Sequence, residues 1–75
     1  MILYYLTNND NTPYDTEGKP LDMLGNPVAR LAIFETPQLA AMFEQDCENQ
    51  ENNHIIRLDT VRNTVTETAI TKQEA

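Results

Sequence analysis

Apolar and polar positions divide the chain into short segments, and the first of these is a strand. Residues 2–6 (ILYYL) are apolar on both faces and rich in branched and aromatic side chains, which predicts a central, buried strand. The polar run that follows, residues 8–13, ends it, because Asn and Asp side chains hydrogen-bond to nearby backbone groups.

Residues 8–27 form a connection that is long for so short a chain, which indicates a functional loop or an element hidden from the pattern. Two copies of Gly-x-Pro-apolar-x-x-Leu follow one another at residues 18–24 and 25–31. Glycine permits a positive φ and the residue before proline is extended, so each copy predicts a turn that leads into an extended segment. The second copy enters residues 28–34 (VARLAIF), whose alternation predicts a second strand.

Thr36 and Pro37 mark the start of a helix, since a threonine hydroxyl caps the first turn and proline fits its first position. Apolar side chains then recur at three- and four-residue spacing, which predicts a helix over about residues 37–49. The expected apolar stripe consists of Leu39, Ala40, Met42, Phe43 and Cys47.

Residues 54–61 (HIIRLDTV) predict a further strand, with Ile56 and Leu58 facing the core and Arg57 and Asp59 facing solvent. A tight turn at residues 62–63 leads to a threonine-rich edge strand at residues 64–70. Residues 71–75 are expected to fray.

The order strand, long loop, strand, helix, strand, strand predicts a single α+β domain over residues 1–75. Its sheet should have three or four mainly antiparallel strands, with the helix packed on one face. The apolar stripe of the helix should meet five side chains of the strands, namely Leu3, Leu31, Ile33, Ile56 and Leu58.

The length of 75 residues and the single cysteine limit how such a domain can be stabilised. A chain of this size buries little surface and has no internal disulfide, so a homodimer is the expected support. The apolar runs are far shorter than the roughly 20 residues that cross a bilayer, and no secretory signal is apparent. One free thiol and no export signal predict a cytoplasmic protein, and the acidic surface argues against binding to anionic membranes.

Twelve acidic and five basic residues give a formal net charge of −7. This charge repels phosphate backbones and argues against direct binding to DNA or RNA. It favours a protein partner with a basic surface.

Candidate chemistry is sparse. One histidine and one cysteine do not make a zinc site, and the acidic residues after residue 8 lack the glycine and glutamate spacing of an EF-hand. Cys47 lies on the apolar stripe between Asp46 and Glu48, whose charges raise a thiol pKa, so we expect a buried structural cysteine. The sequence predicts neither an enzyme nor a bound cofactor or metal ion.

The remaining signal is the distribution of carboxylates. Glu44, Glu48 and Glu51 stand at i, i+4 and i+7 of the expected helix and would form one ridge. The other candidate partner-binding residues are Asp46, beside that ridge, and the acidic residues of the long loop, Asp10, Asp15, Glu17 and Asp22. Such a surface is either a solvated face or a patch shaped for a basic partner.

Two functions follow from these alternatives. The first is a small acidic protein-binding module that inhibits or modulates a nucleic-acid-handling partner by nucleic-acid mimicry. Compact acidic inhibitors of phages and mobile elements, such as anti-CRISPR and anti-restriction proteins, share this general composition. The second is a housekeeping or structural module that dimerises through a sheet edge or its helix, with the charge serving solubility.

Overall fold

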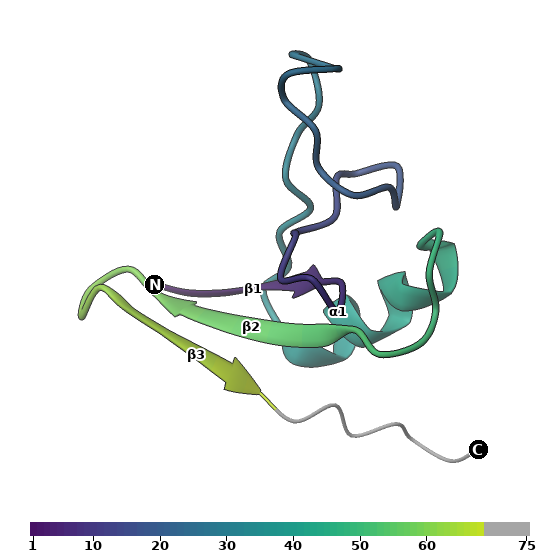
Figure 1. Ribbon diagram of the computed structural model, residues 1–75. Coiled ribbons are helices and arrows are strands. Elements are labelled where there is room, and N and C mark those ends of the chain that lie inside the picture. The colour runs from purple at the N-terminus through teal and green to yellow at the C-terminus, as the bar shows by residue number, and fades with distance from the viewer. Residues whose placement is uncertain (69–75) are drawn as a thin grey trace.

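A computed structural model describes residues 1–68 as a three-stranded antiparallel sheet with one short helix, which confirms the α+β class (Figure 1). Along the chain the elements are β1 (Ile2–Thr7), α1 (Pro37–Phe43), the single-turn 3-10 helix η1 (Glu44–Asp46), β2 (His54–Asp59) and β3 (Thr64–Thr68). The residues between β1 and α1 rise away from the sheet in Figure 1. We call residues 8–35 the arm.

The sheet has the order β1-β2-β3, so β2 and not β1 is the central strand. The expectation of a central first strand was wrong because the segment that flanks β1 on its other side is not a strand. Tyr4 exchanges two backbone hydrogen bonds with Phe34, of 2.8 Å each, and this isolated bridge covers the outer edge of β1.

The predicted strand over residues 28–34 does not form. Its backbone groups are divided between two partners that lie apart: Phe34 bonds to β1, whereas the carbonyl of Arg30 and the N–H of Ala32 bond to Thr16 and Tyr14 within the arm. Only isolated bridges result, which removes the second strand from the expected order and leaves the helix between β1 and β2.

The start of helix α1 is as predicted, but its end is not. The hydroxyl oxygen of Thr36 accepts a hydrogen bond from the Leu39 N–H (3.2 Å), and Pro37 occupies the first turn. The α-helix stops at Phe43, whereas the prediction extended it to residue 49. No basic residue stands in its last turn to interact with the C-terminal carbonyls. The backbone that follows bonds to the arm instead, through the Glu48 N–H and the Gly18 carbonyl.

The apolar stripe of the helix is narrower than expected. Ala40 and Cys47 are buried and Phe43 packs against them, whereas Leu39 and Met42 are exposed. The predicted stripe therefore covered too wide an arc, since Ala40 and Phe43 at i and i+3 share a face that Leu39 and Met42 at i−1 and i+2 leave, and Cys47 lies beyond the α-helix.

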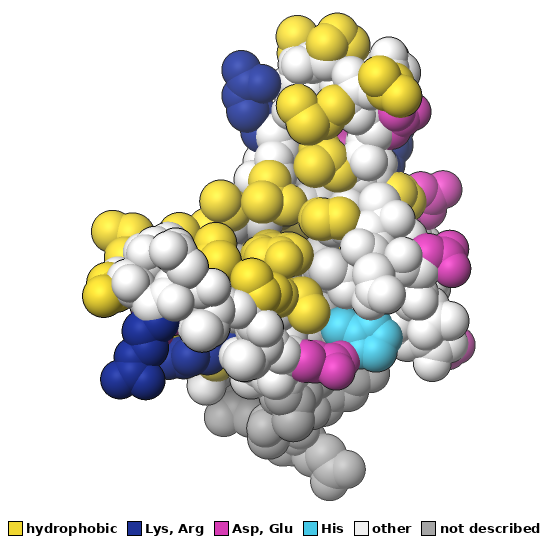
Figure 2. All heavy atoms as spheres, turned by 60° about the vertical axis from the view of Figure 1, so that its left-hand side comes forward, with side chains coloured by type: hydrophobic (Ala, Val, Ile, Leu, Met, Phe, Trp, Pro, Cys, Tyr) yellow, Lys and Arg dark blue, Asp and Glu magenta, His cyan; other side chains and the backbone are white. Residues whose placement is uncertain are grey.

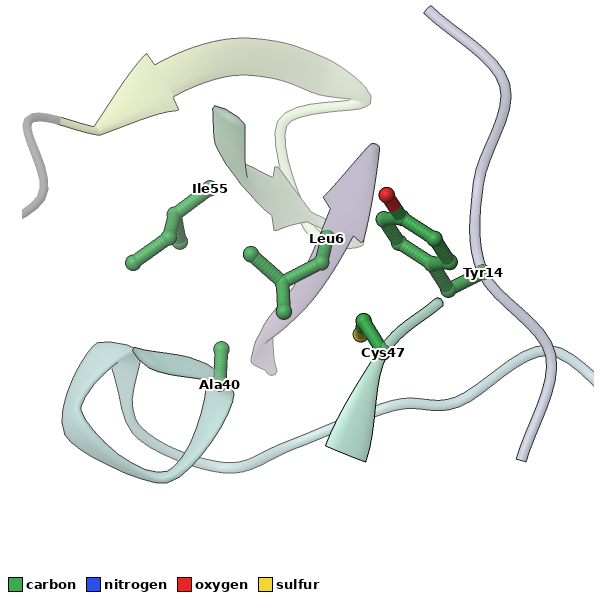
Figure 3. Close-up of a cluster of buried hydrophobic side chains, with 5 residues drawn as sticks. All are labelled: Leu6, Tyr14, Ala40, Cys47 and Ile55. Carbon is green, nitrogen blue, oxygen red and sulfur yellow. The ribbon is translucent and has the colours of Figure 1, made fainter. Parts of the chain in front are cut away.

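The core lies between α1, the sheet and the arm, and its buried side chains converge in Figure 3. Beside Ala40 and Cys47, it contains Leu6, Ile55 and Tyr14. The rings of Phe34 and Phe43 extend it, with centroids 5.1 Å apart and planes tilted by 44°. The strand residues predicted to meet the helix, Leu3, Leu31, Ile33, Ile56 and Leu58, are not among these buried ones.

The facing of β2 is the reverse of the prediction. Leu6 pairs with Ile55 in the antiparallel register, and both are buried against α1. Ile56 and Leu58 therefore point to the opposite face of the sheet. The pattern favoured the other phase, because Ile56 and Leu58 alternate with the charged Arg57 and Asp59, but the pairing of Ile55 with Leu6 overrides that alternation.

Asp59 is buried rather than solvent-facing, because its carboxylate closes the β2–β3 turn. Its Oδ1 atom accepts hydrogen bonds from the N–H groups of Val61 (3.0 Å) and Arg62 (3.1 Å). These bonds, the Arg62 one first, hold the pKa of the Asp59 carboxyl below its ordinary value. Asn63 completes the predicted turn with a φ of 54°. Residues 69–70 of the predicted edge strand and the expected frayed segment 71–75 lie outside the described residues.

Candidate protein-binding surface

The predicted carboxylate ridge is not present, because α1 ends before it begins. Glu44 lies in η1 and is only 9% exposed, and its Oε2 atom accepts a hydrogen bond from Asn53 Nδ2 (3.1 Å). Glu48 and Glu51 follow η1 in irregular backbone. The three residues therefore do not share one helix face, and Glu44 has a structural role.

A buried polar network joins the arm to the segment before β2. The Tyr14 hydroxyl, from the arm, donates to Asn53 Oδ1 at 2.6 Å and lies 3.3 Å from the Asn49 carbonyl oxygen. Asn53 Nδ2 also donates to the Asn49 carbonyl (2.7 Å). Burial raises the pKa of the Tyr14 phenol, and the nearby Cys47 and Glu44 add to this effect. The network fixes the base of the arm against residues 44–53.

Gly18 forms the second contact between these segments. It is buried with a φ of 79°, and its carbonyl accepts a hydrogen bond from the Glu48 N–H (2.7 Å). A Cβ atom at this position would overlap the backbone carbonyl of Asp46. Only glycine allows both this conformation and this close approach.

The Gly18 contact brings three exposed carboxylates onto neighbouring stretches of backbone. Glu17 precedes Gly18, the backbone carbonyl of Asp46 lies against Gly18, and the N–H of Glu48 donates to the Gly18 carbonyl. We call Glu17, Asp46 and Glu48 the acidic junction. Within residues 1–68 none of the three forms an ion pair with a lysine or arginine, although Lys19 is exposed in the same turn. Their charges are therefore open to solvent and to a partner.

Two of the predicted binding residues shape turns instead. Asp15 is buried, and its Oδ1 accepts from the N–H groups of Glu17 (2.8 Å) and Lys19 (3.1 Å). Asp22 Oδ1 accepts from the Gly25 N–H (3.0 Å) at the far end of the arm, although its side chain stays exposed. Asp15 organises the turn that carries the acidic junction and is not part of its surface.

Asp10 and Glu51 complete the predicted set. Both are exposed, Asp10 in the turn after β1 and Glu51 in the loop before β2. Figure 2 shows Asp and Glu side chains spaced along the right-hand side of that view, with Lys and Arg mainly on the left. The exposed carboxylates are thus spread over several loops. Those of the acidic junction lie on segments that the Gly18 backbone contact joins.

Cys47 and His54 do not form a pair. Cys47 is buried in the core, where burial first and the charges of Glu44, Asp46 and Asp15 next raise its pKa to about 11. His54 contacts Glu67 of β3, and since its neighbour Ile55 points into the core, His54 points to the opposite face. Among residues 1–68, no three His, Cys, Asp or Glu side chains are grouped so that they could hold a metal ion.

Sequence reasoning missed Tyr14, Asn53 and Gly18 as the residues that assemble the surface. The spacing of Tyr14 and Asn53 along the chain gives no signal, because their bond joins residues 39 positions apart. Gly18 did carry a signal, as a glycine in a turn of the repeated segment. Its burial depends on tertiary packing that the repeat does not encode.

No protein-family model, curated protein or solved structure matches this chain. In the described part of the chain, no helix combines the length and apolar character needed to span a bilayer.

Proposed function

We propose that this chain is a small acidic protein-binding module that occupies a basic, nucleic-acid-binding surface of a partner protein and so inhibits or modulates it. The observation that carries the proposal is the acidic junction: three exposed carboxylates on rigidly joined backbone, without a lysine or arginine ion pair among residues 1–68. Carboxylates held in fixed positions can replace phosphates in a groove lined by basic side chains.

The net charge of −7 supports the same proposal, since it attracts a basic surface over a distance of about one Debye length, ~10 Å at 0.1 M salt. The rigidity of the acidic junction also supports the proposal. The Tyr14–Asn53 bond and the Gly18 contact hold the two segments together before any partner binds, so little conformational entropy is lost on association.

The test compares two variants of equal charge. The first, Glu17→Gln with Asp46→Asn and Glu48→Gln, neutralises the acidic junction. The second neutralises three exposed carboxylates elsewhere, by Asp10→Asn, Glu35→Gln and Glu51→Gln. Each protein is immobilised and exposed to a nuclease-treated cytoplasmic extract, and retained proteins are quantified by mass spectrometry.

We expect the wild-type chain and the second variant to retain the same partner in equal amounts. The first variant should retain at least about tenfold less of it, because each desolvated charge contact contributes about 1 kcal/mol or more. With the purified partner, binding should weaken from low to high salt, and added double-stranded DNA or RNA should displace the chain. Equal retention by both variants, or binding unaffected by salt and nucleic acid, would contradict the proposal.

A further inference from the structure

The two edges of the sheet differ in how they are covered. The outer edge of β1 is occupied by the arm, through the Tyr4–Phe34 bridge and the bond from the Tyr14 N–H to the Leu6 carbonyl (3.0 Å). The outer edge of β3 pairs with nothing in residues 1–68. Its backbone N–H and C=O groups form an open row that can add a further strand.

Strand β3 has few of the features that usually protect an edge. Its sequence, TVTET, contains no proline, glycine or lysine, and four of its five residues are β-branched. Its one charged side chain, Glu67, contacts His54 on β2. Val65 is 60% exposed and lies beside Leu58 in the register.

We infer that β3 pairs with β3 of a second copy of this chain, antiparallel and about a two-fold axis at Thr66. The two sheets then join into one sheet with three strands from each copy. This register uses every residue of β3. It places Thr66 opposite its own counterpart and Thr64 opposite Thr68 of the second copy, and cross-strand threonine pairs of this kind are favourable.

Charge supports this register over its neighbour. An axis at Glu67 would place two glutamates directly opposite each other, which is destabilising. With the axis at Thr66, each Glu67 instead lies opposite Val65 of the second copy, whose exposed methyl groups can pack on its aliphatic stem. The strand is thus complementary to itself, which favours a second copy as the occupant.

The pairing should be weak and should strengthen with salt. A single strand edge buries well below the ~1,600 Å² of a standard interface. The two copies also repel each other, each with a net charge of −7, and salt screens this repulsion. The proposed binding to a basic partner has the opposite salt dependence, so the failure of one proposal does not decide the other.

The association is measured by sedimentation equilibrium of the full chain from about 10 µM to about 1 mM, the range in which small interfaces form. We expect a monomer–dimer equilibrium with a dissociation constant that falls as salt rises. Thr66→Lys places two lysines across the axis and should raise that constant at least about tenfold. Gln38→Lys, on the exposed side of α1, makes the same change in charge and should leave it unchanged.

The register is read from single cysteine substitutions, which alter the strand less than lysine does. Thr66→Cys brings the two Cα atoms to a separation of about 5 Å, within disulfide range, whereas Thr64→Cys leaves them about 14 Å apart. Buried Cys47 should not compete. We expect rapid disulfide dimers of Thr66→Cys only. A chain that is monomeric throughout, a dimer insensitive to Thr66→Lys, or equal cross-linking by Thr66→Cys and Gln38→Cys overturns the inference.

Discussion

The two copies of the repeated segment in the arm share a sequence pattern but occupy opposite environments. In the first copy, Gly18 is buried against the backbone of Asp46, with a positive φ. In the second copy, Gly25 is exposed at the far end of the arm and has no positive φ. A pattern that predicts a turn in both places therefore says nothing about which turn the fold depends on.

The difference arises from the range of the contacts. The Gly18 turn bonds to Glu48, thirty positions along the chain, and rests beside the buried Tyr14. The Gly25 turn is closed by local bonds, from the Gly25 N–H to Asp22 Oδ1 and from the Asn26 N–H to the Asp22 carbonyl (2.8 Å). Long-range contacts make the base of the arm part of the core, whereas the tip is held by its own turn.

The largest expected effect separates the two glycines. Gly18→Ala forces a Cβ into the Asp46 carbonyl and a side chain into a left-handed conformation, so we expect a loss of about 3 kcal/mol or more. Because a domain of this size has only about 3–5 kcal/mol of stability, this variant should be largely unfolded. Circular dichroism during urea denaturation measures the effect.

Gly25→Ala is the matched control. There a Cβ would meet only the end of the flexible Asp22 side chain, which can move aside at the exposed tip with the loss of its hydrogen bond from the Gly25 N–H. Its free energy of unfolding should fall by no more than about 1 kcal/mol, the net contribution of one hydrogen bond. Equal loss in the two variants would show that the two turns are equivalent after all.

Local signals in the sequence predicted local structure correctly. Thr36 and Pro37 begin the helix and Asn63 takes the left-handed conformation in the turn, because each depends on neighbours in the chain. Residues 2–6 form a strand through their pairing with β2, whereas residues 28–34 form only isolated bridges. The β2 phase failed for a different reason. Ile55 and Ile56 are both apolar, and only pairing with Leu6 decides which is buried.

The acidic junction could not be predicted from the sequence, since its assembly depends on a contact between distant segments. Glu17, Asp46 and Glu48 were all among the candidate residues, but the contact between the two segments that carry them follows from the Gly18 bond. The prediction that Glu44 lies on the surface was wrong, because its carboxylate accepts a hydrogen bond from Asn53, nine positions along the chain. The sequence shows where the carboxylates stand along the chain, but it does not show which of them accepts a hydrogen bond from a buried amide.

The second prediction concerns the polar network at the base of the arm. Tyr14→Phe removes the hydroxyl that donates to Asn53 and leaves a buried amide oxygen without that donor, so we expect a loss of about 1–3 kcal/mol. Tyr5→Phe is the control, because among residues 1–68 the Tyr5 hydroxyl has no hydrogen-bond partner and its ring is half-buried. Similar urea midpoints for the two variants would exclude a structural role for the bond.

The third prediction uses pH at the same site. Burial raises the pKa of both Tyr14 and Cys47, so their neutral forms belong to the folded state. The stability they contribute is fully present below the unfolded-state pKa values and is lost as pH rises toward the folded-state values, about 11 for Cys47. The urea midpoint should therefore fall above about pH 9, and less so in Cys47→Ala.

Thiol labelling gives an independent measurement of the same shift. Iodoacetamide at pH 8 should modify Cys47 in the folded chain more than tenfold more slowly than in urea, roughly the effect of burial and a suppressed thiolate. Labelling at the unfolded rate without denaturant would place Cys47 at the surface and remove it from the core of Figure 3.

The smallest expected effect concerns the leucine that ends each copy, and here the second copy should be the sensitive one. Leu24 and Leu31 end the first and second copies, yet Leu24 is 100% exposed whereas Leu31 is half-buried and forms a bridge with Asp15. Leu24→Ser should change the free energy of unfolding by less than about 0.5 kcal/mol, and Leu31→Ser should lower it by about 1 kcal/mol. At the glycine position we expect the first copy to be sensitive, and at the leucine position the second, because Gly18 contacts the backbone of Asp46 and Leu31 pairs with Asp15, whereas Gly25 and Leu24 are exposed. Urea denaturation of the two serine variants therefore tests whether the loss of stability follows the position in the repeat or the distance from the core. A loss of stability in Leu24→Ser as large as that in Leu31→Ser would mean that the tip of the arm is packed as well.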